Sequence, residues 1–313
     1  EYGNAEWGDL LTNWNGQPLE YDSIGNLTAF GTEGAARREL FWNGRQLKSI
    51  RLGQGAAATN ILYEYNSDGL RISRTATDAD EQAAVTKYIY NGDILAGEIR
   101  DDGKSLLFYY DNNGQPFGLR YNGTDYYYLR NLQNDVAAIA DGTGAIAARY
   151  YYDAWGNLLS VTDGAGHAVT DAEHIGLVNP IRYRGYYYDS DTGFYYVSSR
   201  YYDPEIGRWI SPEPNVYAGA FDSGSGLIGY NVYAYCANNP VNFSDPTGEF
   251  ILTALIVGVV AGAVIGGAIG GTVAYNSAKS SGLEGSDLFW ATAGGVGKGA
   301  LIGGVAGGLV GAT

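Results

Sequence analysis

Residues 182–214 read RYRGYYYDSDTGFYYVSSRYYDPEIGRWISPEP, and this stretch decides the fold. Eight of its 33 residues are tyrosine, and they flank the turn-forming segments DSDTG (189–193) and DPEIG (203–207). Tyrosine, phenylalanine and valine suit a pleated, half-buried surface, whereas aspartate, glycine and proline suit the reversals between strands. The stretch therefore predicts β-hairpins with aromatic faces.

Residues 1–160 repeat one pattern, in which aromatic residues are followed by Asp or Asn, then Gly, then a short aliphatic run. The copies are EYDSIGNL (20–27), FWNGRQL (41–47), YEYNSDGL (63–70), YIYNGDIL (88–95), FYYDNNGQPF (108–117), YYYLRNLQNDV (126–136) and YYYDAWGNLL (150–159). The turn glycines are Gly25, Gly44, Gly69, Gly92, Gly114 and Gly156, with an Asn134-Asp135 turn in one copy. A unit of about 20 residues holds two strands and two turns, so the period predicts a stacked or spiralling array of hairpins. An ordinary antiparallel sandwich is the alternative.

Composition and charge exclude several function classes. The 313 residues include 47 Gly and 28 Tyr, with a net charge of −15. The charges of the four charged residues in 250–313 sum to zero, so residues 1–249 carry the whole net negative charge. Phosphate contacts need clusters of Lys and Arg, which argues against nucleic acid or anionic lipid as a partner of residues 1–249.

Cysteine and histidine are scarce. Cys236 is the one cysteine, which excludes an internal disulfide and a cysteine-based metal site, and its aromatic surroundings (YAYCAN) indicate a small buried residue. His167 and His174 are the only histidines and lie in a segment, 161–181, that reads as a loop with a short helix before Pro180. We expect two solvated histidines, no cofactor and no metal. The chain opens in mid-motif, which suggests a fragment of a longer protein.

The string RYYDPEIGRW (200–209) and the repeats upstream resemble the Rhs/YD-repeat family of polymorphic toxins and ABC-toxin C components. The resemblance covers residues 1–249. It implies YD-repeat hairpins (1–165) that spiral into part of a hollow shell, followed by a repeat-associated core (166–249) that closes it. Family members of this kind carry a variable C-terminal toxin as enclosed cargo.

The resemblance also implies an intramolecular aspartyl protease that cuts just after a DPxG motif, here DPTG at 245–248. Two carboxyl groups held close together cannot both ionise, so one serves as acid and the other as base. Carried over residue by residue, Arg200 is the family's arginine and Asp245 its second aspartate. The scissile bond is expected near Glu249 and Phe250.

Two departures weaken this protease assignment. The first aspartate belongs in SPDP, but this chain has SPEP with Glu213, and small misplacements in such a site cost on the order of 10²-fold. Glu249 stands where cutting members have a bulky apolar residue. In the alternative interpretation, Glu213 and Asp245 are turn residues that cap strand ends beside prolines.

Residues 250–313 are predicted to form a helical hairpin packed through glycines. Residues 250–275 carry no charge, which is long enough for a helix to cross the ~30 Å hydrocarbon core of a bilayer. Glycines at four-residue intervals make a flat helix face that admits a second helix. These are Gly258, Gly262, Gly266, Gly270, Gly295, Gly299, Gly303, Gly307 and Gly311. Insertion into a target membrane is favoured, and a plug packed inside the shell is the alternative.

Together these features predict a mainly β protein with a C-terminal helical hairpin. The expected function is the C-terminal shell and core of a secreted or cell-surface toxin-delivery protein. Its partners would be its own C-terminal effector, an immunity protein and the target-cell membrane. The alternative is an adhesion or carbohydrate-binding YD-repeat protein, and a free-standing enzyme is disfavoured.

Overall fold

The structure is a computed structural model that describes residues 1–34, 36–214, 231–245, 248, 274, 276–283, 287–288 and 291. The chain divides into two compact units. One unit holds residues 1–238 and 246–250, and the other holds residues 239–245 and 251–313. Every element named below lies in the first unit.

Fifteen strands form one antiparallel sheet in which each strand pairs with the next in sequence. Their bounds are β1 Asn13–Trp14, β2 Gln17–Tyr21, β3 Leu27–Phe30, β4 Arg38–Asn43, β5 Gln46–Leu52, β6 Thr59–Tyr65, β7 Arg71–Thr77, β8 Ala83–Asn91, β9 Ile94–Arg100, β10 Ser105–Tyr110, β11 Pro116–Tyr121, β12 Thr124–Arg130, β13 Val136–Asp141, β14 Ile146–Tyr152 and β15 Leu158–Thr162. We call this the repeat sheet.

A second antiparallel sheet, the core sheet, has four strands in the order β16-β17-β18-β19. They are β16 Tyr187–Asp189, β17 Phe194–Val197, β18 Arg200–Asp203 and β19 Arg208–Trp209. The helical elements of the first unit are short. They are the α-helix α1 Ile175–Val178 and the 3₁₀ turns η1 Gly55–Ala57, η2 Tyr183–Gly185 and η5 Cys236–Asn238. The prediction of a mainly β fold is therefore confirmed.

Two kinds of turn join most strands of the repeat sheet, while longer loops connect β3 to β4 and β5 to β6. In the first, an Asp or Asn side chain accepts main-chain N–H groups two and four residues ahead, as Asp22 does from Ile24 and Asn26 at 3.0 and 2.8 Å. Gly25 completes this turn with φ +87°. In the second, two residues suffice, as at Asn122-Gly123, where both φ angles are positive. Positive φ is the conformation that favours glycine and asparagine, which explains the turn composition.

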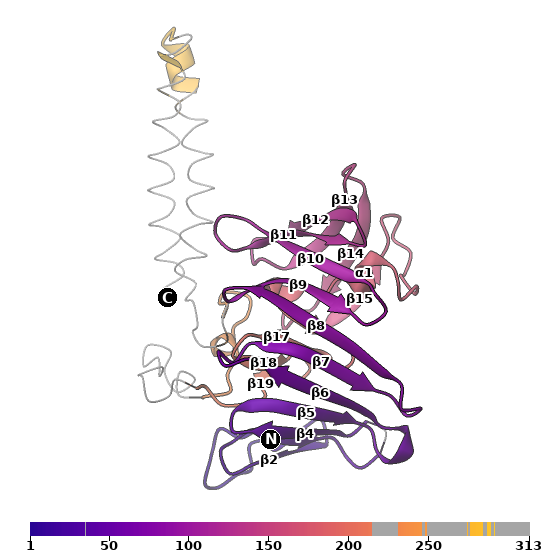
Figure 1. Ribbon diagram of the computed structural model, residues 1–313. Coiled ribbons are helices and arrows are strands. Elements are labelled where there is room, and N and C mark those ends of the chain that lie inside the picture. Colours follow the sequence, from indigo (N-terminus) through magenta and orange to yellow (C-terminus); the bar gives the residue numbers. More distant parts are fainter. Residues whose placement is uncertain are drawn as a thin grey trace. The chain divides into compact units, whose positions relative to one another are not determined.

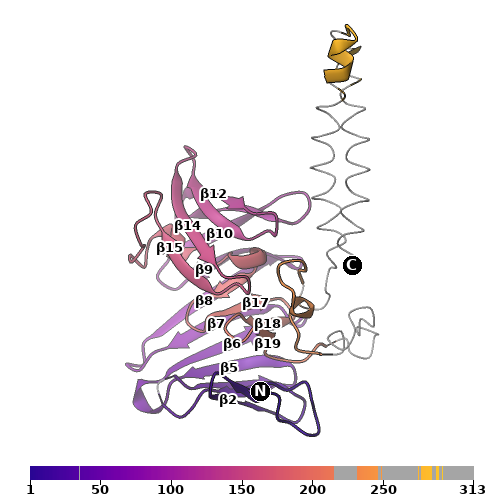
Figure 2. The ribbon, with the colours of Figure 1, turned by 180° about the vertical axis from the view of Figure 1, so that it is seen from behind.

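The core sheet packs on one face of the repeat sheet. One apolar cluster joins Phe194, Tyr196 and Tyr201 to buried residues of β2–β6, among them Leu40 and Tyr63. Figures 1 and 2 both show β17 and β18 beside β6 and β7. A second cluster is built by β10–β15 together with α1. The aromatic hairpins predicted for 182–214 are thus the inner layer of the unit.

The expected short helix before Pro180 is confirmed as α1. Across the described ranges, no helix is long and apolar enough to cross a membrane. Of the uncharged stretch 250–275, residues 250–273 and 275 lie outside the described residues, as do all nine predicted helix-packing glycines. The helical hairpin therefore stays a prediction.

Candidate functional site

A buried ion pair fastens the core sheet to the repeat sheet. Arg71 on β7 donates two hydrogen bonds to the Asp189 carboxylate on β16, at 2.5 and 3.1 Å, and both residues are buried. The rings of five tyrosines surround the guanidinium, with centroids 4.5 to 5.8 Å away: Tyr63, Tyr88, Tyr187, Tyr196 and Tyr201. The Asp189 carboxylate and the ring faces offset the cost of burying the Arg71 charge. Removal of either member of the ion pair would leave the other charge buried without its partner.

Tyrosine hydroxyls of the core segment bond to the turns of the repeats. The Tyr195 and Tyr202 hydroxyls donate to the carbonyls of Gly156 and Trp155, each at 2.8 Å. The Tyr233 hydroxyl donates to the Gly25 carbonyl at 2.8 Å. Phenylalanine would fill the same space but remove these donors from the buried carbonyls of Gly25 and Gly156 and from the partly buried carbonyl of Trp155, which accounts for the choice of tyrosine.

A second ion pair ties RYYDP to the repeat sheet. Arg38 on β4 lies 3.1 Å from the Asp203 carboxylate and 2.6 Å from that of Glu205. Burial raises the pKa of Asp203 from its ordinary 3.8 to about 6, although Arg38 and main-chain N–H groups favour the charged form. Asp203 is therefore an anchor of the core sheet with a carboxyl that titrates in mildly acidic solution.

Two of the three expected protease residues lie together. Arg200, buried on β18, pairs through Nη2 with the Glu213 carboxylate at 2.7 Å. Its Nε–H donates to the carbonyl oxygen of Gly248, the last residue of DPTG. Nε and Nη2 are adjacent donors on one edge of the guanidinium fork, so the Gly248 carbonyl and the Glu213 carboxylate lie side by side.

Gly248 occupies a notch that admits only glycine. Its φ is +75°, and an added Cβ would lie 2.8 Å from the Ser199 Oγ and from the Val197 carbonyl oxygen. The β17–β18 turn thus holds the main chain of Gly248 against Arg200. The guanidinium also stacks over the Trp209 ring, 4.1 Å from its centroid, which fixes its orientation.

The remaining expected site residues are placed as follows. Asp245 is buried and belongs to the second compact unit. Glu249 and Phe250 lie outside the described residues. Whether Asp245 meets Glu213 therefore stays a prediction.

The other singled-out side chains have structural surroundings. Cys236 is buried and forms no disulfide, since it is the single cysteine of the sequence. His174 caps α1 by accepting the Gly176 N–H at 3.1 Å, and exposed His167 lies 3.2 Å from Asp163. Among the described residues, no group of three or more His, Cys, Asp or Glu side chains is placed to hold a metal ion.

Comparison with known proteins shows the family of this chain. A family model described as Teneurin YD-shell matches residues 56–241. The chain belongs to the Teneurin YD-shell family. Its fold also resembles the crystal structure of TcdB2-TccC3-Cdc42, with a TM-score of 0.54 and 21% identity over 74% of this chain and 13% of that one.

Curated relatives include proteins named as toxins and nucleases. The tRNA nuclease WapA of Bacillus subtilis (strain 168) is 32% identical over 251 residues, which is 79% of this chain and 10% of WapA. The toxin protein Tse5 of Pseudomonas aeruginosa is 33% identical over 283 residues, 82% of this chain and 20% of Tse5. The double-stranded DNA deaminase toxin A of Burkholderia cenocepacia is 28% identical over 268 residues, 77% of this chain and 17% of that protein. The chain thus spans about a tenth of the WapA relatives and a fifth or less of the other two.

Proposed function

We propose that this chain is the C-terminal shell and core of a secreted or cell-surface toxin-delivery protein, which encloses and presents an effector encoded beyond it. Membership of the YD-shell family and the toxin names of the relatives support this proposal. The core sheet, fastened to the repeat sheet through Arg71–Asp189 and Arg38–Asp203, would close one end.

Enclosure is testable on the full-length natural protein. A protease added outside should leave an enclosed effector intact while the shell is folded. Low concentrations of urea that open the shell should expose the effector to digestion. Degradation of the effector at the same rate in folded and opened protein would contradict the proposal.

We further propose that the core cuts its own chain between Gly248 and Glu249. The observation that supports this is the contact of Arg200 with both the Gly248 carbonyl and the Glu213 carboxylate. Arg200 would polarise the carbonyl and stabilise the negative charge that develops on its oxygen. With this role the cut would fall directly after DPTG, within the region near Glu249 and Phe250 that the sequence suggests.

The reaction would be a hydrolysis shared by two carboxyl groups. Glu213, as carboxylate, takes a proton from a water molecule whose oxygen bonds to the Gly248 carbonyl carbon. Asp245, as the neutral acid, gives its proton to the Glu249 nitrogen as the C–N bond breaks. The products are a carboxyl at Gly248 and an amine at Glu249. Because glutamate is one methylene longer than the family's aspartate, we expect slow cleavage.

Intact-mass measurement of the purified chain tests the cut. We expect fragments 1–248 and 249–313 to accumulate slowly, to form faster in Glu213→Asp by up to ~10²-fold, and to be absent in Asp245→Asn and Arg200→Lys. Asp80→Asn, an exposed turn substitution, is the control. An uncut chain in both the wild type and Glu213→Asp would refute the self-cleavage proposal and leave the shell proposal standing.

Residues 250–313 are proposed to enter the target membrane. The support is compositional: 26 uncharged residues at 250–275 and two series of glycines at four-residue intervals. Dye release from liposomes of neutral lipid should depend on this segment and weaken when Gly262 and Gly266 are replaced by leucine. Equal release by the wild type and the double variant would contradict a glycine-packed hairpin.

A further inference from the structure

A cavity of about 570 Å³ lies in the first unit, beside β8, β9, α1 and β16. One part of its wall is apolar: Ala84, Val85, Leu158, Leu177, Val178 and Pro180. Tyr187 and Tyr188 add aromatic surface, and several charged side chains complete the lining. Its volume is in the range of natural small-ligand pockets.

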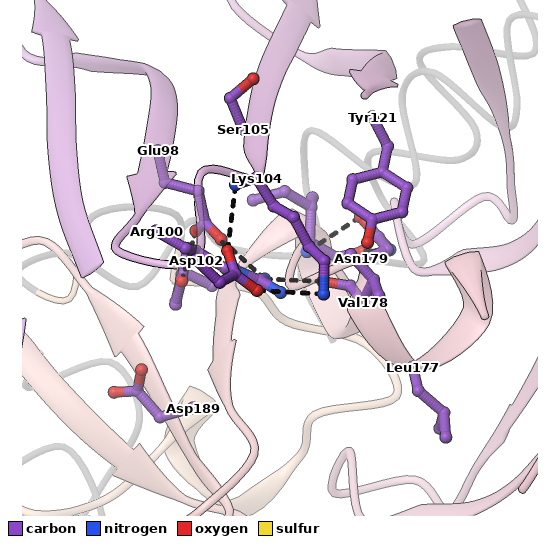
Figure 3. Close-up of polar contacts among 12 residues, drawn as sticks. Glu98, Arg100, Asp102, Lys104, Ser105, Tyr121, Leu177, Val178, Asn179 and Asp189 are labelled. Carbon is purple, nitrogen blue, oxygen red and sulfur yellow. Dashed lines mark hydrogen bonds and ion pairs between the residues drawn. The ribbon is translucent and has the colours of Figure 1, made fainter. Parts of the chain in front are cut away.

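The acidic side chains around this cavity have partners of their own. Glu98 is held by Arg100 at 2.7 Å and by the Tyr187 hydroxyl at 2.6 Å, and Arg100 also reaches the Val178 carbonyl at 3.3 Å. Figure 3 shows Glu98, Arg100, Asp102 and Lys104 gathered beside Val178 and Asn179. The other pairs are Asp102 with Lys104, Asp189 with Arg71 and Asp191 with Arg74, while Asp101 accepts the Val85 N–H.

Arg182 differs from these residues. It lines the cavity and is only 3% exposed, yet no carboxylate lies within ion-pair distance of it in the part of the chain that the structure describes. Its donors reach the main-chain carbonyls of Asn179 and Leu177, each at 3.0 Å, and its guanidinium stacks over the Tyr188 ring at 4.5 Å. The Tyr150 hydroxyl also interacts with it. Dipoles and ring faces offset a buried positive charge only in part.

We propose that this cavity binds a carboxylate, which pairs with Arg182 while an apolar body lies against the aliphatic wall. Nε and Nη2 of Arg182 each already donate to a main-chain carbonyl, so the carboxylate would accept from the remaining N–H groups on the Nη1–Nη2 edge, whose planar geometry matches a carboxylate. Asp101, Asp102 and Asp191 are exposed residues of the same lining, and they disfavour a multiply charged anion such as phosphate because like charges repel. The ligand is thus a singly charged carboxylic acid, either a small organic acid or a glutamate side chain between apolar residues of a peptide.

Calorimetric titration of the whole chain with hexanoate tests the site, with hexanamide as the uncharged match. A second arm uses the peptide acetyl-Leu-Glu-Leu-amide and its Gln counterpart. We expect saturable binding of at least one acid and none of its neutral match. Binding of hexanoate identifies a small-acid site, and binding of the peptide alone identifies a peptide site.

Two substitutions locate the binding. Arg182→Met should weaken it at least about tenfold. Should that variant fail to fold, Ala84→Trp keeps Arg182 and fills the cavity from an exposed position on β8. Ala83→Trp, on the neighbouring exposed residue outside the cavity lining, is the matched control and should bind normally. No saturable binding of either acid up to about 10 mM, or binding that Ala84→Trp leaves unchanged, would overturn the proposal.

Discussion

The Arg71–Asp189 pair is expected to be the most sensitive point of the fold. Asp189→Asn keeps the size of the side chain and removes its charge. The variant therefore leaves the Arg71 guanidinium buried at 1% exposure with no carboxylate beside it. Asparagine can accept one of the two hydrogen bonds that Arg71 now donates.

The magnitude follows from the burial of both partners. Breaking a buried ion pair by removal of one member costs about 3–5 kcal/mol. The five tyrosine rings around Arg71 retain part of the compensation, so we expect the lower half of that range, about 3 kcal/mol. Replacement of both partners, in Arg71→Met/Asp189→Asn, removes the bare charge and should recover much of the loss.

Urea unfolding followed by fluorescence measures this effect in a double-mutant cycle. The loss of unfolding free energy in the double variant should be smaller than the sum of the losses in Arg71→Met and Asp189→Asn, because the two residues are in direct contact. The exposed pair Arg120–Asp125, 2.7 Å apart, is the matched control, and Asp125→Asn should change stability little.

One result would refute the reasoning. If the free energy of unfolding of Asp189→Asn lies within about 0.5 kcal/mol of the wild-type value, as it does for ordinary surface substitutions, the pair does not fasten the two sheets. Strictly additive effects of the two single substitutions would also refute the reasoning, because they would show no coupling between Arg71 and Asp189.

Three further outcomes are expected. Tyr195→Phe should cost about 1–2 kcal/mol in urea unfolding, since the buried Gly156 carbonyl loses its donor, and an unchanged midpoint would contradict this. Gly156→Ala should lower the melting temperature more than the control Gly103→Ala, because both have positive φ but only the former Cβ would meet the Tyr183 ring, at 2.6 Å. The folded-state pKa of Asp203 is about 6, above its ordinary 3.8, so its protonation stabilises the fold fully below 3.8 and this contribution is lost as the pH rises through 6. The stability of the wild type relative to Asp203→Asn should therefore rise as the pH falls from 7 to 4, by about 2 kcal/mol, and a constant difference would contradict the assignment.

Local patterns in the sequence predicted much of the fold. Alternating aromatic residues with Asp/Asn-x-x-Gly turns predicted the hairpins, because both signals act within one strand pair. Asn134 was expected to replace a turn glycine, and its φ of +72° confirms this. The spacing did not separate the two turn types: Gly25 lies in a turn capped by Asp22, whereas Gly44 lies in a two-residue turn between Asn43 and Gln46.

Contacts between residues far apart in the chain could not be predicted from local sequence patterns. Arg71 and Asp189 are 118 positions apart, and nothing in RISRTAT or YYD specifies that they meet. Asp203 was taken as part of a motif, and only its burial beside Arg38 shows that it anchors the core sheet. For the candidate site, the motif singled out Arg200 and Glu213, and the structure brings these two side chains together, while their catalytic role stays a prediction. It gave no sign that Arg200 also holds the Gly248 carbonyl, since that contact depends on the notch beside Ser199.

Electron cryomicroscopy of the full-length natural protein tests the central claim most directly. The account predicts that β1 continues into preceding strands of a closed wall, that the core sheet seals one end, and that density for the downstream effector lies inside. A map in which the strands do not close into a shell, or in which the effector lies outside it, would contradict the account.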